Sequence, residues 1–123
     1  MSAARASTAE LGASAEESAC RYLLDQGHQL LARNYRCRYG EIDLIMGDGS
    51  TIVFVEVRMR SRTDFGSGAE SVDSRKQGRI LRSAEHYLKR HATLLASCRF
   101  DVVSILRAGN ELQLNWIRNA FGA

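Results

Sequence analysis

The sequence is poor in several residue types, and most of these shortages exclude a class of protein. It has no proline, which leads to no conclusion about function, and only three cysteines in 123 residues. Cys20, Cys37 and Cys98 form no C-x-x-C pair and have no histidines at zinc-ligand spacing, so we expect reduced thiols in a cytoplasmic protein. No apolar run approaches the roughly 18 residues of a membrane span. Residues 1–10 lack the apolar core of a secretory signal. We therefore expect no membrane partner.

The residues that are present indicate one soluble domain. Hydrophobic residues make up 45% and charged residues 25% of the chain, as in ordinary globular proteins. A chain of 123 residues can bury one core without disulfides or a structural metal. The formal net charge of +3 favours an anionic partner only weakly, because many basic proteins bind no anion.

Hydrophobic periodicity predicts two helices. In the first, Ser14 has the spacing of a capping box, although the helix could start near Thr8, and Gly27 is its predicted end. The second begins at about Asp73, with Ser74 as its candidate cap, and its apolar stripe includes Ile80, Leu81, Ala84, Tyr87 and Leu88.

Five strands are predicted around these helices, at residues 28–37, 40–46, 51–60, 99–106 and 111–118. The turn between the second and third strands is centred on Asp48–Gly49. The second helix would be a crossover that favours a parallel third and fourth strand. The order is α-β-β-β-α-β-β, an α/β fold with a mixed central sheet of about five strands flanked by helices.

Acidic residues gather at one end of the central hairpin. Side chains alternate along a strand, so Glu56 shares a face with Phe54 and Arg58. With the turn centred as predicted, Asp43 lies opposite Phe54 and Glu41 lies opposite Glu56. Asp43 is then diagonal to Glu56, roughly 7–8 Å away. The other face would carry Ile42, Leu44, Met46, Val53, Val55 and Val57. Burying carboxylates together is costly unless a cation compensates, which favours a site over a plain surface patch.

Carboxylate oxygens without histidine or cysteine suit a hard cation, Mg²⁺ or Mn²⁺. Such an ion activates water and neutralises charge on phosphate oxygens. Arg58 would face the same site and could hold a phosphate. Glu16 lies at the edge of the inward stripe of the first helix, where it is either a further site residue or an exposed carboxylate favoured by the helix dipole.

Cations gather on the second helix and its approach. Steps of three and four along the helix connect Arg75, Arg79, Arg82, His86 and Lys89, and Arg60 and Arg62 follow the third strand. The stripe could follow a nucleic-acid backbone, or it could be a solvated helix face. Lys76 shares a helix face with Ile80, so it could point to the sheet or be exposed.

A resemblance to a known family runs through residues 12–121. It is carried, in chain order, by AEESACRYL, GEIDLI, FVEVR, VDSRKQGRI, RFDVV and IRNAF. These segments resemble the YraN family of uncharacterised bacterial proteins. That family is in turn similar to the restriction-endonuclease-like PD-(D/E)xK nucleases, especially compact Holliday-junction resolvases. The resemblance implies a single nuclease-like domain at residues 12–121, preceded by a flexible tail at residues 1–11.

The resemblance also implies roles for individual residues. Glu16 would be the helix carboxylate, Asp43 the metal-binding aspartate, and Glu56 the acid of the E-x-K element. The backbone carbonyl of Val57 would be a further metal ligand. The chain departs from the pattern at Arg58, where the family usually has lysine. Arginine stays protonated and cannot act as a base, although it can stabilise a phosphate. Lys76 matches a lysine that the family usually carries.

Three functions stay open at this point. The first is a Mg²⁺- or Mn²⁺-dependent, resolvase-like nuclease, with DNA favoured over RNA as its partner. The second is a nucleic-acid-binding protein of the same fold that has lost catalysis, which the arginine at position 58 favours. The third is an interaction protein that forms a homodimer or docks a partner through a sheet edge, with purely structural carboxylates.

Overall fold

The computed structural model describes residues 8–60, 72–91, 97–109 and 111–122. Its elements, in chain order, are α1 (Thr8–Asp25), β1 (Gln29–Cys37), β2 (Gly40–Asp48), β3 (Thr51–Arg60), α2 (Ser74–Arg90), β4 (Ser97–Ala108) and β5 (Glu111–Phe121). This order confirms the predicted α-β-β-β-α-β-β arrangement. Neither helix in the described ranges is long and apolar enough to cross a membrane.

The five strands form one mixed sheet in the order β1-β2-β3-β4-β5. β3 and β4 are parallel, and the other neighbouring pairs are antiparallel. The parallel pair confirms the crossover prediction, since the chain leaves β3 at one end of the sheet and enters β4 at the other through α2. β1 is an edge strand with mostly exposed residues, which agrees with its poor alternation in the sequence.

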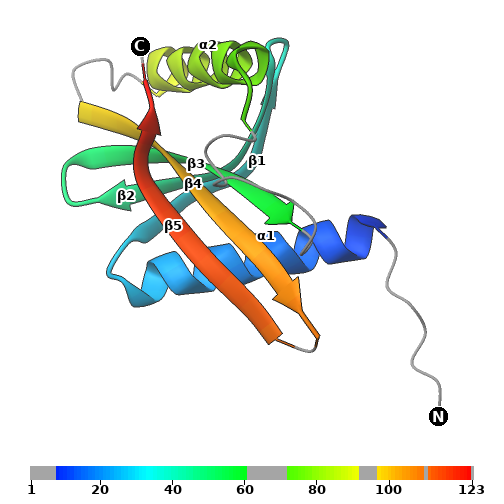
Figure 1. Ribbon diagram of the computed structural model, residues 1–123. Coiled ribbons are helices and arrows are strands. Elements are labelled where there is room, and N and C mark those ends of the chain that lie inside the picture. The colour runs from blue at the N-terminus through cyan, green and yellow to red at the C-terminus, as the bar shows by residue number, and fades with distance from the viewer. Residues whose placement is uncertain (1–7, 61–71, 92–96, 110, 123) are drawn as a thin grey trace.

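The two helices cover opposite faces of the sheet (Figure 1). On the α1 face, Leu23 packs in one cluster with Val53 and Val55. On the α2 face, Ile80 packs in a second cluster with Phe54. Consecutive β3 side chains therefore enter different cores, as alternation requires. The central strands are apolar on both sides because both sides are covered.

The helix ends correct two details of the prediction. α1 begins at Thr8, which confirms the earlier of the two predicted starts; Ser14 therefore lies inside the helix, and its capping box is wrong. Gly27, with φ of 94°, ends the helix as predicted. α2 is capped by Asp73 instead of Ser74, because the Asp73 carboxylate accepts a 2.8 Å hydrogen bond from the backbone N–H of Lys76. This cap fixes the first turn of α2, from which Lys76 reaches the sheet.

Candidate functional site

The β2–β3 turn positions the two central carboxylates. β2 and β3 pair from Asp48↔Thr51 to Leu44↔Val55. The turn is therefore Gly49–Ser50, one residue later than predicted, and the predicted pairing is wrong by two residues. An even shift keeps every β3 side chain on its predicted face. The pairing ends one residue before Asp43 and Glu56, and their carboxyl groups lie close enough to interact.

A long-range contact and a local backbone conformation both support the position of this turn. Asp48 accepts a 3.0 Å hydrogen bond from Arg99 of β4, which holds Asp48 at the end of β2. Gly49 then supplies the positive φ, 60°, that the turn needs. The turn therefore combines a local signal, a glycine at its first central position, with support from β4.

Strand alternation is interrupted at Asp43. Ile42 packs with Phe54 on the α2 face, whereas Leu44 packs on the α1 face. The prediction that Ile42 and Leu44 share a face is therefore wrong. The neighbouring strand β1 is irregular at the same level. Asn34 has a φ of 49°, and it lies across from Asp43 between the pairs Arg33↔Leu44 and Tyr35↔Ile42. A left-handed residue re-aims the strand locally, and asparagine is among the types that tolerate it best.

Asn34 also connects two further carboxylates. In the amide orientation that its neighbours require, its side-chain nitrogen donates to Glu41 Oε1 at 2.8 Å and Glu16 Oε2 at 3.1 Å. Glu16, Glu41 and Asp43 have carboxylate oxygens within 4.8 Å of one another. Glu16 thus joins Asp43 as the resemblance implied. Sequence reasoning assigned no ligand role to Glu41 or Asn34, although an asparagine inside a strand is a recognisable sign of an irregularity.

The β3 backbone completes this group. The Val57 N–H donates a 2.8 Å hydrogen bond to Asp43 Oδ2. The N–H and C=O of one strand residue face the same neighbouring strand. The Val57 carbonyl therefore faces the Asp43 side as well, which is the placement that a metal ligand at Val57 requires.

Burial, together with crowding of the carboxylates, raises the pKa of two of them. Burial and the charge of Asp43 raise the pKa of Glu56 from 4.5 to about 7, and Lys76 opposes this shift. Burial, Asp43 and Glu41 raise the pKa of Glu16 from 4.5 to about 7, although Asn34 lowers it. Both groups therefore bind a proton more readily than an ordinary glutamate, and a cation among them would favour their ionised forms.

Lys76 lies against Glu56, which is only 4% exposed, with Nζ 2.5 Å from Oε1. Of the two alternatives for Lys76, the one in which it points to the sheet is confirmed. A hollow of about 200 Å³ opens here between β2, β3 and α2; it is lined by Gly40, Glu41, Asp43, Glu56, Lys76, Arg79 and Ile80. Alternation puts Arg58 on the same face of β3 as Glu56.

The predicted basic stripe lies along α2. Arg75, Arg79 and Arg82 are exposed, and Arg79 also lines the carboxylate hollow. Arg60, at the end of β3, is half-buried. Arg62 lies outside the described residues. A role for these cations in binding nucleic acid stays a prediction.

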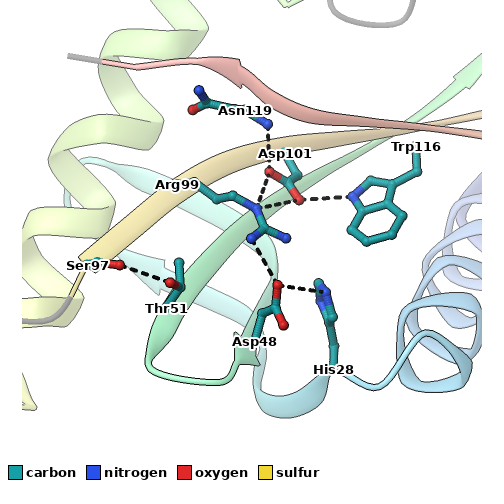
Figure 2. Close-up of polar contacts among 8 residues, drawn as sticks. All are labelled: His28, Asp48, Thr51, Ser97, Arg99, Asp101, Trp116 and Asn119. Atoms are coloured by element: carbon teal, nitrogen blue, oxygen red, sulfur yellow. Dashed lines mark hydrogen bonds and ion pairs between the residues drawn. The ribbon is translucent and has the colours of Figure 1, made fainter.

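A second polar cluster holds the other end of the sheet together (Figure 2). Asp101 of β4 is fully buried and accepts hydrogen bonds from Trp116 Nε1 and the Asn119 backbone N–H, both at 2.9 Å. Arg99 bridges Asp101, at 3.1 Å, to Asp48, at 3.0 Å. Sequence reasoning gave Asp101 no role. The cluster joins β5, β4 and the β2–β3 turn, so it supports the site from a distance.

Similarity to other proteins covers most of the chain. A family model described as "Uncharacterised protein family UPF0102" matches residues 15–105. The chain belongs to this family. A UPF0102 protein of Methylobacillus flagellatus is 49% identical over 114 residues, which are 93% of this chain and 98% of that protein. UPF0102 proteins of Stutzerimonas stutzeri and Nitrosomonas europaea are 51% and 50% identical, each over 89% of this chain and 92% of the relative.

UPF0102 membership confirms the YraN resemblance. The matched region contains every carboxylate of the hollow together with Asn34 and Lys76, whereas β5 lies beyond it. The site is therefore built within the part of the chain that the UPF0102 model covers. The family description names no activity, so the chemistry must be argued from the side chains.

Proposed function

We propose that this UPF0102 protein is a metal-dependent nuclease that hydrolyses phosphodiester bonds in DNA or structured nucleic acid. One observation carries the proposal. Four carboxylates, those of Glu16, Glu41, Asp43 and Glu56, converge with the ammonium group of Lys76 where β2 and β3 separate beside α2. A structural ion pair would need only one of these carboxylates.

The donor set fits Mg²⁺ or Mn²⁺. Asp43, Glu56 and the Val57 carbonyl would hold the ion, with Glu16 and Glu41 at the edge of the same group. All of these ligand atoms are oxygens, which hard cations prefer. The raised pKa values of Glu16 and Glu56 support the fit, because they arise from burial and carboxylate repulsion that a cation would relieve. A bound ion would lower the pKa of a water molecule that it coordinates and would neutralise negative charge on the phosphate.

The protein side chains have separate tasks in this chemistry. Lys76 is 40% exposed at its side chain, so its ammonium group can turn from Glu56 to a phosphate oxygen or to the attacking water. Lys76 would thus provide the amine that the usual lysine provides at position 58, where this chain has arginine. Arg58 can contribute only positive charge, because a guanidinium stays protonated at neutral pH. The exposed cations of α2 would hold the rest of the phosphate backbone.

The test is cleavage of labelled branched DNA, linear duplex DNA and single-stranded RNA with Mg²⁺ or Mn²⁺. The wild-type protein is expected to cleave at least one of them, and Glu56→Gln to cleave none. Glu111→Gln, which neutralises an exposed carboxylate on β5, is the matched control and should cleave like the wild type. Equal cleavage by Glu56→Gln and the control would remove Glu56 from the mechanism.

The arginine at position 58 favours a second candidate, a nucleic-acid-binding protein without catalysis. The same experiment separates the two. Binding that weakens steeply with added salt, without cleavage of any substrate, supports this second function. Cleavage restored by Arg58→Lys would show that the site is intact and lacks only its usual lysine.

A further inference from the structure

A second hollow lies between the β1–β2 turn and α2. Its volume is about 360 Å³, and it is lined by Arg38, Tyr39, Arg82, Glu85, His86 and Lys89. The first two residues come from the turn between β1 and β2, and the other four from α2. Figure 1 shows this turn reaching up beside α2. The volume is in the lower part of the range for small-molecule sites.

The charge of this hollow is positive. Lys89 Nζ lies 2.9 Å from Glu85 Oε1, so the carboxylate is already neutralised inside the hollow. Arg38 and Arg82 remain as excess cations, and Arg82 forms no ion pair with any residue that the structure describes. An anion is therefore the complementary ligand.

An aromatic ring is fixed beside these cations. Arg38 donates a 2.6 Å hydrogen bond to the Tyr39 hydroxyl, and its guanidinium carbon lies 4.8 Å from the ring centre. The His86 ring meets the Tyr39 ring edge to face at 6.3 Å and is itself held by Tyr35, whose hydroxyl lies 2.5 Å from Nδ1. A planar ring beside held cations matches a base next to its phosphate.

The second hollow adjoins the carboxylate hollow. Tyr39 lines one and the next residue, Gly40, lines the other. On α2, Arg82 lines the second hollow and Arg79, three residues earlier, lines the carboxylate hollow. Three residues of helix span about 4.5 Å along its axis, so the two hollows lie close together along α2. A ligand that occupies both hollows would therefore place adjacent nucleotides in them.

We propose that this hollow binds an unstacked nucleotide next to the bond that is cleaved, with its base against Tyr39 and its phosphate on Arg38 and Arg82. The proposal rests on the proposed nuclease function for its substrate class and narrows that class. It selects nucleic acid with an unpaired nucleotide at the cleavage position, such as a single strand, a flap or a branch. Base stacking on an aromatic ring is tolerant of sequence, so no base preference is expected.

The test measures binding without cleavage. A fluorescein-labelled 12-nucleotide thymidine strand, an abasic strand of equal length and a 12-base-pair duplex are titrated in EDTA and followed by fluorescence anisotropy. Tyr39→Ala is expected to weaken binding of the thymidine strand by about fivefold to a hundredfold, the effect of losing one base–aromatic stack. Tyr39→Phe should bind like the wild type. Binding of the abasic strand and the duplex should change less than about twofold.

Further variants keep the result interpretable. Tyr39→Leu retains apolar bulk without a ring and should behave like Tyr39→Ala, which guards against a folding defect in the smaller variant. Arg82→Ala should weaken the thymidine and abasic strands alike, whereas Arg107→Ala, at an exposed cation of β4, should weaken neither.

Equal affinity of wild type and Tyr39→Leu for the thymidine strand overturns the proposal, and so does equal affinity of the wild type for the thymidine and abasic strands. The cleavage assay tests the nuclease function independently of this binding measurement. If wild type and the Tyr39 variants cleave at the same rate, the nucleotide site is refuted and the nuclease function stands. If binding depends on Tyr39 but no substrate is cleaved, the nuclease function is refuted and the nucleotide site stands.

Discussion

Neutralising Glu56 should stabilise the metal-free protein, because this carboxylate is held where its charge is unfavourable. Glu56 is 4% exposed and lies beside Asp43. Lys76 compensates only in part, since the pKa of Glu56 is still raised to about 7. In Glu56→Gln the amide can still accept a hydrogen bond from Lys76, whose half-exposed ammonium group also has access to water.

The size of the effect depends on pH. The Glu56 carboxyl group has a pKa of 4.5 when unperturbed and about 7 in the fold. Between these values the folded state binds more protons than the unfolded state, so wild-type stability falls as pH rises and levels off above pH 7. Each tenfold change in proton affinity is worth about 1.4 kcal/mol, so the whole difference is about 3 kcal/mol. Glu56→Gln cannot ionise at this position, so it does not lose this stability as the pH rises.

Urea unfolding in EDTA, followed by the fluorescence of the single tryptophan, measures the difference. The advantage of Glu56→Gln over wild type should be about 2–3 kcal/mol greater at pH 8 than at pH 5. Glu111→Gln, the exposed control, should show no such change between the two pH values. A Glu56→Gln advantage that is the same at both pH values, or that shrinks at pH 8, would refute the argument from carboxylate crowding. Confirmation would mean that the site is maintained at a cost in stability.

Three further predictions concern the supporting residues. Asp101→Asn should lower the unfolding free energy by about 3–5 kcal/mol, because a buried amide cannot accept from all the donors that the Asp101 carboxylate now satisfies and weakens its ion pair with Arg99; urea unfolding checks this, and a loss below about 1 kcal/mol would contradict it. His28 has its pKa lowered by burial, so wild-type stability should fall as pH drops below about 6.5, and His28→Gln should reduce that fall in the same assay. Lys76→Met should raise the Glu56 pKa further and abolish cleavage, whereas Lys76→Arg should leave that pKa nearer its wild-type value; carboxyl NMR titration and the cleavage assay test both.

Much of the fold follows from local patterns in the sequence. The apolar stripes at helical spacing set α1 and α2, and the length of the α2 crossover makes β3 and β4 parallel. The position of Glu56 at the charged end of an otherwise apolar strand marked the site. Its face survived the error in the turn, because the register moved by two residues and side chains alternate with a period of two.

The remaining geometry depends on contacts that local patterns do not contain. Arg99 reaches Asp48 from β4 and supports the turn that brings Asp43, rather than Glu41, next to Glu56. The left-handed Asn34 of β1 lies at the level where the alternation of β2 is interrupted. Lys76 meets Glu56 only after α2 has docked on the sheet. Each of these contacts joins residues that are distant in sequence, which is why the carboxylates could be found in the sequence but their arrangement could not.

Cleavage of labelled branched DNA as a function of Mn²⁺ concentration tests the central claim most directly. Wild type is expected to show a rate that rises and saturates with Mn²⁺, Asp43→Asn to show none, and Asp25→Asn, at an exposed carboxylate in the last turn of α1, to match the wild type. A rate that does not depend on Mn²⁺, or that Asp43→Asn retains in full, would contradict the claim that these carboxylates hold a catalytic metal ion.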